Sequence, residues 1–295
     1  MLTLSANFTD RLYLLYFFLA SAGLLLRPGR VSNCLFWLIV NFLCLVVLGF
    51  FVRNRPHSPT WEFLHNWYPL IMFIVCFEEV SHLSFLLRDG WQDHYLLRLE
   101  AWLFSVPPTV WLGRLGSPLV TEFMEVGYFS YFVLFLIVGG VLYSEEDKHA
   151  FRQVMDATVL SYLICYAAFI LFPTEGPAYT LAAQHNFQLP GTGPFHWLVM
   201  LIQKNAGVHG NAFPSAHVAG AVVALIFAWR YAPVLGLSLT PLVILLCFGA
   251  VYDRYHYLSD VVAGIVIGAV PAAWVMAAGG RPHCTDGGGN RAASR

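Results

Sequence analysis

Long runs of apolar residues alternate with short polar segments along almost the whole chain. A membrane-spanning helix needs about 20 mostly apolar residues. Eight runs come close to this length, and they cover residues 12–26, 31–52, 67–88, 119–143, 150–172, 213–231, 235–252 and 259–279. The pattern predicts an all-α protein, a multi-pass membrane helical bundle with eight spans.

The spacing of these runs divides the chain into three parts. Residues 1–58 hold the first two spans and predict an N-terminal transmembrane hairpin. Residues 59–279 hold the other six spans, which predict one membrane domain. Residues 280–295 are rich in glycine and small polar residues, a composition that predicts a disordered tail.

The first span has a second interpretation as a signal peptide. Ala20-Ser21-Ala22 resembles the small-residue cleavage site that follows such a segment. Only Arg11 supplies positive charge ahead of the run, which is weak for a signal peptide. We therefore expect this span to be retained.

Composition agrees with a membrane protein and excludes other classes. Hydrophobic residues make up 58% of the 295 residues and charged residues 11%. Soluble domains have about 45–50% and about 25%, respectively. The 16 Lys and Arg are balanced by 17 Asp and Glu, so the chain has no excess positive charge to attract nucleic acid. The 6 cysteines show no CxxC spacing, which argues against a thiolate metal site.

Basic residues give the expected orientation in the membrane. With eight spans both termini lie on one side, and that side receives slightly more Lys and Arg than the other. Cytoplasmic loops carry an excess of these residues. We expect cytoplasmic termini, with the two long connections, 89–118 and 173–210, on the extracytoplasmic face of the plasma membrane.

Three polar segments on that face carry the candidate chemistry. They lie at 172–179, 211–217 and 252–260. In the last of them, His256 and Asp260 are four residues apart and would share one face of a helix. A carboxylate that accepts the Nδ1–H of an imidazole leaves Nε2 free as a nucleophile or base. Arg254 could supply a planar donor pair for phosphate oxygens. The alternative is an ordinary interfacial helix end.

The segment before the sixth span has the pattern of a helix start. Pro214 and Ser215 precede an apolar run, with Ser215 as the expected N-cap. Free N–H groups at a helix start bind anions, and His217 would stand beside a bound phosphate. Ordinary capping with an interfacial histidine is the alternative.

Taken together, these motifs resemble the type-2 phosphatidic acid phosphatase superfamily, whose signatures are KxxxxxxRP, PSGH and SRxxxxxHxxxD. Residues 214–217, Pro-Ser-Ala-His, match the second signature with Ala for Gly, and His256 and Asp260 match the third. The resemblance covers residues 67–279 and is greatest to the inositol phosphorylceramide synthase-like subgroup. It implies a six-helix phosphatase-like core to which the hairpin is added.

Three cationic positions of the family pattern are not basic here. Gly176 and Phe169 stand where the first signature has Arg and Lys, and Gly249-Ala250 replaces the SR pair. Arg254, one helical turn after Ala250, is the expected substitute. Glu175, Tyr179 and Lys204 are candidates for contacts with a head group or an acceptor, although an exposed loop Glu is the simpler interpretation of Glu175.

The resemblance implies metal-independent phosphoryl transfer, with no cofactor, from a lipid or polyprenyl phosphate. His256 would attack phosphorus, Asp260 would orient it, and His217 would protonate the leaving oxygen. Arg254, Ser215 and the backbone after Pro214 would hold the phosphate. Water as acceptor makes a lipid phosphatase, and an alcohol makes a head-group phosphotransferase. Membrane lipids are the expected surroundings, and the sequence leaves the oligomeric state open.

A second class of function is a transporter or scaffold that keeps the phosphatase-like fold without catalysis. The three lost cations favour it, and the retained trio of His217, His256 and Asp260 favours an enzyme. Further ionisable residues inside spans three and four leave three interpretations open: structural pairing between the two spans, a polar groove, or a metal site built on one Glu79-x-x-His82 pair. These residues are Glu78, Glu79, His82, Glu122 and Glu125.

Overall fold

The computed structural model describes residues 6–54, 58–145, 148–185, 187, 189–206 and 209–279. Within these ranges the chain is all-helical, with no strand, and each predicted run overlaps a helix, although the helix for the run 67–88 covers Pro59–His82. These eight helices are α1 (Phe8–Leu26), α2 (Cys34–Arg53), α3 (Pro59–His82), α6 (Pro118–Ser144), α7 (His149–Leu171), α10 (Ala216–Tyr231), α11 (Pro233–Tyr252) and α12 (Leu258–Ala278). The expected tail, 280–295, lies outside the described residues.

The chain is an integral membrane protein that crosses the membrane several times. Within the part of the chain that the structure describes, six helices are long and apolar enough to span it: α1, α2, α6, α7, α11 and α12. The other two long helices, α10 and α3, do not meet both conditions of length and apolar composition. α10 has 16 residues, and α3 carries Glu62, Glu78 and Glu79.

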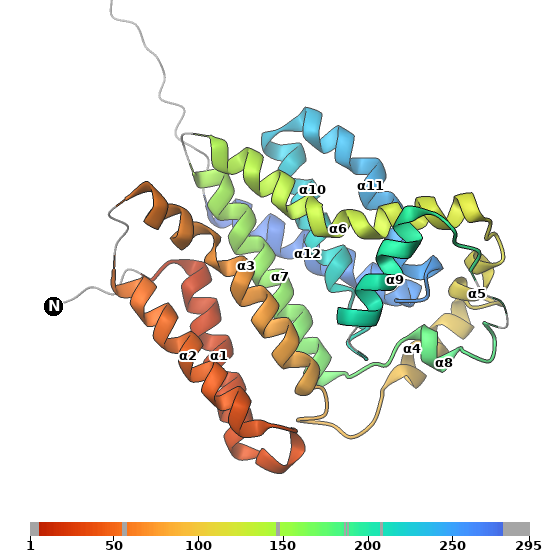
Figure 1. The fold of residues 1–295 in the computed structure, drawn as a ribbon, viewed down its shortest axis with the longest axis horizontal. Coiled ribbons are helices and arrows are strands. Elements are labelled where there is room, and N and C mark those ends of the chain that lie inside the picture. Colours follow the sequence, from red (N-terminus) through yellow and green to blue (C-terminus); the bar gives the residue numbers. More distant parts are fainter. Residues whose placement is uncertain are drawn as a thin grey trace, which may run out of the picture.

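Four short helices gather at one end of the bundle, on the right of Figure 1. They are α4 (Asp93–Leu103), α5 (Pro108–Gly113), α8 (Pro177–Thr180) and α9 (Pro194–Ala206). We call this the site end. Proline at the first position begins several helices, where a missing N–H costs nothing, and Ser58, Ser117 and Ser215 cap the helices that follow them.

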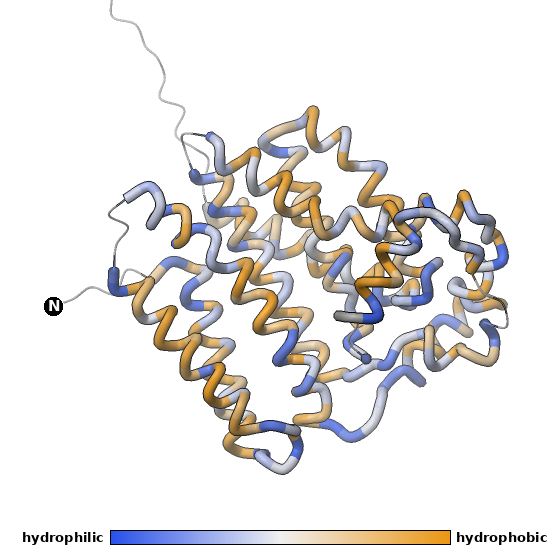
Figure 2. Tube along the Cα trace, in the orientation of Figure 1, coloured by the Kyte–Doolittle hydropathy of each residue, from blue (hydrophilic) through white to orange (hydrophobic). Residues whose placement is uncertain are grey.

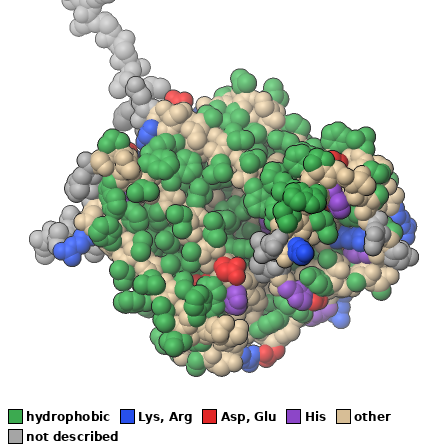
Figure 3. All heavy atoms as spheres, viewed as in Figure 1, with side chains coloured by type: hydrophobic (Ala, Val, Ile, Leu, Met, Phe, Trp, Pro, Cys, Tyr) green, Lys and Arg blue, Asp and Glu red, His purple; other side chains and the backbone are tan. Residues whose placement is uncertain are grey.

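The surface matches a lipid environment between the two ends of the bundle. Hydrophobic residues dominate the long helices, and hydrophilic ones collect at helix ends and in the site-end segments (Figure 2). The left part of the face in Figure 3 is covered mostly by hydrophobic side chains. Phe18 and Ile74, for example, are 65% and 64% exposed.

Glycines let two pairs of helices approach closely. A Cβ on Gly264 of α12 would lie 2.5 Å from the Ser215 carbonyl oxygen, and one on Gly268 would lie 2.5 Å from that of Ala219. The spacing G-x-x-x-G is one that membrane helices use for such contacts. α6 meets α11 in the same way, since a Cβ on Gly127 would lie 2.5 Å from the Leu245 Cβ. The starts of α10 and α12 are therefore fixed against each other.

One interpretation of the sequence expected the carboxylates of α3 to pair with those of α6. In the structure these carboxylates have other partners. Glu79 accepts a hydrogen bond from Asn41 Nδ2 on α2 (2.7 Å), which joins the N-terminal hairpin to the rest of the bundle. Glu122 accepts the Phe195 N–H (2.7 Å) at the start of α9. Glu125 Oε1 lies 2.8 Å from His196 Nδ1. The pairing is structural, and its partners are α2 and α9.

Candidate active site

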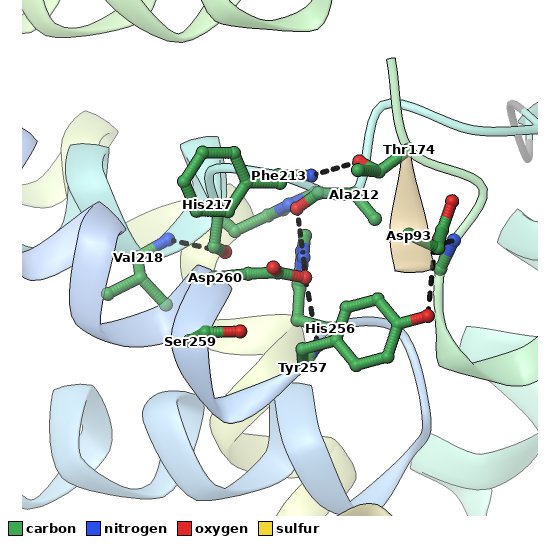
Figure 4. Close-up of polar contacts among 12 residues, drawn as sticks. Asp93, Thr174, Ala212, Phe213, His217, Val218, His256, Tyr257, Ser259 and Asp260 are labelled. Carbon is green, nitrogen blue, oxygen red and sulfur yellow. Dashed lines mark hydrogen bonds and ion pairs between the residues drawn. The ribbon is translucent and has the colours of Figure 1, made fainter. Parts of the chain in front are cut away.

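The three polar segments meet at the site end. The turn after α7, the loop before α10 and the loop between α11 and α12 lie side by side in Figure 4. The Phe213 N–H donates to Thr174 Oγ1 (2.7 Å), which joins the first segment to the second. The Ser215 N–H donates to the Asp260 carbonyl oxygen (3.0 Å), which joins the second to the third. Contacts between residues 39 and 45 positions apart thus join the three segments into one site.

His256 is buried, and its ring is held in one orientation. Nδ1 lies 2.8 Å from the Ala212 carbonyl oxygen and 3.5 Å from Asp260 Oδ2 (Figure 4). A carbonyl oxygen can only accept a hydrogen bond, so Nδ1 carries the proton and donates it. In the neutral ring Nε2 then keeps its lone pair and can act as a nucleophile.

Asp260 lies beside His256 but is not its nearest partner. Oδ2 accepts the Tyr257 N–H (2.8 Å) in the first turn of α12, a capping contact. Oδ1 is buried without a hydrogen-bond partner among the described residues. The expected orienting role of Asp260 is therefore shared with the Ala212 carbonyl. The carboxylate stands close enough to stabilise a positive charge on the imidazole.

His217 approaches His256 from the first turn of α10. The two ring centroids are 5.8 Å apart. Tyr131 and Tyr128 pack against His217 at 4.5 and 5.2 Å, and the Tyr128 hydroxyl lies 3.4 Å from His217 Nε2. The structure thus brings the two predicted histidines close together, with two tyrosine rings packed against His217.

Pro214 and Ser215 shape the start of α10 as the sequence predicts. The Phe213–Pro214 peptide bond is cis. Ser215 is the N-cap, and its hydroxyl accepts the Val218 N–H (3.4 Å). The Ser215 N–H is engaged by the Asp260 carbonyl and the Val218 N–H by the Ser215 hydroxyl, so the N–H groups of Ala216 and His217 are the ones that could meet the oxygens of a phosphate.

Arg254 lies in the same loop as His256, and its guanidinium is partly engaged. Nη2 donates to the Phe187 carbonyl oxygen (2.8 Å), whereas Nε is buried without a hydrogen-bond partner among the described residues. Burial raises the pKa of neighbouring Asp253 well above its usual range. Both Asp253 carboxylate oxygens are buried without a hydrogen-bond partner among the described residues, so this carboxyl makes no hydrogen bond to Arg254. Arg254 Nε therefore remains a donor that could bind an anion. The hydrogen bond from Nη2 is to Phe187 and not to either histidine.

Asp93 is a site residue that sequence reasoning missed. Its buried carboxylate accepts the N–H groups of Glu175 and Gly176, both at 2.8 Å, and the Tyr257 hydroxyl at 2.9 Å. It therefore fastens the turn after α7 to the residue next to His256 (Figure 4). Glu100, also missed, accepts the Ser259 N–H (3.0 Å) at the start of α12. Both lie in the long connection 89–118, where no sequence motif points to them.

The three candidate head-group residues occupy different places. Glu175 Oε1 lies 2.8 Å from His209 Nε2, and the Tyr179 and His209 ring centroids are 4.3 Å apart. Glu175 lies in the turn that Asp93 holds, and Tyr179 follows that turn in α8. Lys204 is exposed on α9. The structure thus groups Glu175 with Tyr179.

Comparison with known proteins gives a family match and a curated relative. Residues 94–274 match the family model described as the PAP2 superfamily. A PA-phosphatase related-family protein of Dictyostelium discoideum is 21% identical over 182 residues, which are 55% of this chain and 32% of that protein. The chain therefore spans about a third of the length of this curated relative. No solved structure matches.

Proposed function

Since the chain belongs to the PAP2 superfamily, whose members are generally phosphatases, we propose that it cleaves a phosphate ester of a membrane lipid through a phosphohistidine. The observation that carries this proposal is the pair of histidines with ring centroids 5.8 Å apart, in which the Ala212 carbonyl leaves Nε2 of His256 free. Retention of both histidines and Asp260, without a charged first motif, supports our further proposal that the chain is nearest the inositol phosphorylceramide synthase-like subgroup.

The first half-reaction forms the covalent intermediate. Nε2 of His256 attacks phosphorus, and the bond between phosphorus and the lipid alcohol oxygen breaks. His217 gives a proton to that oxygen. The Ala212 carbonyl and Asp260 stabilise the positive charge that develops on the His256 ring. Arg254, Ser215 and the N–H groups after Pro214 hold the phosphate oxygens, where negative charge accumulates.

The second half-reaction returns the enzyme to its starting state. His217, now neutral, takes a proton from water or from an acceptor alcohol, whose oxygen attacks phosphorus as the bond to His256 breaks. Water makes the protein a lipid phosphatase, and an alcohol makes it a head-group phosphotransferase. By the distribution of basic residues we place the site on the extracytoplasmic face of the plasma membrane, with the termini in the cytoplasm.

The decisive experiment supplies purified protein in nanodiscs with a panel of lipid and polyprenyl phosphates, with and without alcohol acceptors. Released alcohol is measured, and acid-quenched samples are tested for an acid-labile phosphoprotein. Turnover together with that intermediate supports the proposal. Absence of both across the panel points to a non-catalytic transporter or scaffold.

Activity should persist in EDTA. The described residues contain no group of three or more His, Cys, Asp or Glu side chains arranged to hold a metal ion. Glu79 and His82 have other partners, since Glu79 binds Asn41 and the His82 ring packs on Trp37. Rates in EDTA and in added Mg²⁺ should agree within about twofold, and complete loss restored by one divalent ion would contradict the metal-free mechanism.

Replacement of Arg254 tests its role in holding phosphate. Removing one preorganised donor to transition-state charge typically costs about 10²–10³-fold in rate. We expect a loss of this size in kcat/KM for Arg254→Ala, and a smaller loss for Arg254→Lys, which keeps the charge but not the planar donor geometry. The matched control is Arg98→Ala on α4. If Arg254→Ala stays within about threefold of wild type, the residue anchors only Phe187.

A further inference from the structure

A cluster of aromatic rings closed by a carboxylate lies at the edge of the candidate active site. We call it the aromatic box, and it consists of Trp91, Glu175, Tyr179 and His209. The His209 ring contacts both neighbours, with centroid distances of 4.3 Å to Tyr179 and 5.6 Å to Trp91. Its Nε2 lies 2.8 Å from Glu175 Oε1. The His209 ring thus already places a nitrogen atom between two aromatic rings and next to a carboxylate.

The box is built into the fold and open to solvent. Gly210 has φ +99°, and a Cβ there would lie 2.6 Å from Trp91 Cη2, so only glycine lets the ring take this place. Asp93 holds the Glu175 N–H. Tyr179 is 53% exposed and the His209 side chain 54%. Trp91 and Glu175 are thus held in place by the backbone around them, and the exposed His209 ring can be reached and displaced by a ligand.

The box adjoins the reaction centre. Gly176, the residue after Glu175, has φ +105°, and a Cβ there would lie 3.2 Å from the Ala212 Cβ and 3.5 Å from the Tyr255 carbonyl oxygen. Ala212 is the residue whose carbonyl holds His256. The backbone next to Glu175 thus lies against the backbone that holds His256, which favours a ligand whose cationic and phosphate groups are close together.

The chemistry of the box selects a cation. Aromatic faces attract ammonium groups, above all quaternary ones, and a carboxylate adds an opposite charge. The same carboxylate repels an anionic head group. We propose that the aromatic box binds the ammonium head group of a zwitterionic phospholipid, with His209 displaced, while His256 attacks that lipid's phosphorus. This inference rests on the proposed function and specifies its substrate class.

The missing family cations fit such a substrate. A phosphate diester carries one negative charge, whereas a monoester carries about 1.5 to 2 at neutral pH. Gly176, Phe169 and Ala250 occupy positions where the family pattern has basic residues. A diester that brings its own ammonium needs fewer cations from the protein. In an ethanolamine or choline head group a two-carbon linker joins the ammonium to the phosphate, in keeping with the adjacent sites.

The reaction on this substrate is balanced. The phosphorus–oxygen bond to the glycerol backbone breaks, diacylglycerol leaves with a proton from His217, and the head-group phosphate is bound to His256. Water or an alcohol then releases it from the histidine. Phosphatidic acid would give the same lipid product, so diacylglycerol release compares the two substrate classes on one scale.

The test measures diacylglycerol release by the full-length protein in nanodiscs that hold phosphatidylcholine, phosphatidylethanolamine or phosphatidic acid with the same acyl chains. We expect a zwitterionic lipid to have the highest kcat/KM. Glu175→Gln, which keeps shape and removes charge, should lower kcat/KM for that lipid about tenfold and change the phosphatidic acid value less than threefold. Trp91→Ala and Tyr179→Ala should act in the same direction. Trp102→Ala, at an 81% exposed position of α4, is the matched control.

The outcomes separate the inference from the proposed function. A wild type that releases diacylglycerol from phosphatidic acid, without a change of preference in Glu175→Gln, overturns the cation site and leaves the phosphohistidine mechanism standing. Absence of product and of phosphoprotein with every lipid overturns the proposed function itself. A separate readout uses His256→Ala protein, which cannot turn lipid over. Calorimetric binding of glycerophosphocholine to it, weakened by added Glu175→Gln, supports the box, and equal binding overturns it.

Discussion

Replacing His256 by alanine should reduce turnover by about 10⁴-fold or more, because loss of the nucleophile removes the covalent route altogether. The ring is buried but lies at the edge of the bundle, and its polar contacts are with Ala212 and Asp260. The measurement is diacylglycerol release and the acid-labile phosphoprotein, both of which should vanish. Thermal unfolding in detergent provides the control that the variant still folds.

Asp260→Asn sharpens this result. Asparagine keeps an oxygen that can accept the Tyr257 N–H, so the start of α12 is preserved. The Ala212 carbonyl still fixes the tautomer of His256, and only the negative charge beside the ring is lost. We expect a decrease in kcat of about 10²-fold, smaller than for His256→Ala. A wild-type rate in Asp260→Asn would show that the carboxylate serves α12 alone.

Asp93→Ala should be the most damaging change to stability at the site end. It leaves the N–H groups of Glu175 and Gly176 and the Tyr257 hydroxyl without their acceptor in a buried place. Unpaired buried donors cost about 1–3 kcal/mol each. We expect the free energy of unfolding to fall by about 3 kcal/mol or more, and activity to fall with it because the turn beside Ala212 loosens.

Tyr257→Phe is the graded control for Asp93. It removes one of the three donors and keeps the two backbone contacts. It also removes the hydroxyl that pairs with Thr180. The expected loss of stability is about 1 kcal/mol. Equal stability of the Asp93→Ala and wild-type proteins in denaturant titrations would mean that the turn is held by Thr174 and Phe213 instead.

The sequence was sufficient to predict the helices and the histidine pair, and the reasons are local. Each span is a long apolar run. Ser215 as an N-cap, and His256 and Asp260 as an i, i+4 pair, can be recognised from patterns of only a few residues. The Ala212 carbonyl could not be predicted, because any residue supplies a backbone oxygen. The role of Asp93 depends on partners 82, 83 and 164 residues away, which no local pattern encodes. The partners of Glu122 and Glu125 on α9 lie 71 to 74 residues away, so the sequence left the interpretation of these two carboxylates open for the same reason.

The glycine contacts between α10 and α12 limit how a lipid can enter and leave. Gly264 and Gly268 set the backbones of the two helices against each other at the level of Ser215 and Ala219, along the first turn of α10, which carries His217. Parting these helices to admit acyl chains would break that contact and pull His217 from His256. Under the proposed function, substrate and product would therefore pass beside the joined pair rather than between its members. The two helices would move as one rigid unit, and a lipid would reach the histidines laterally from the membrane.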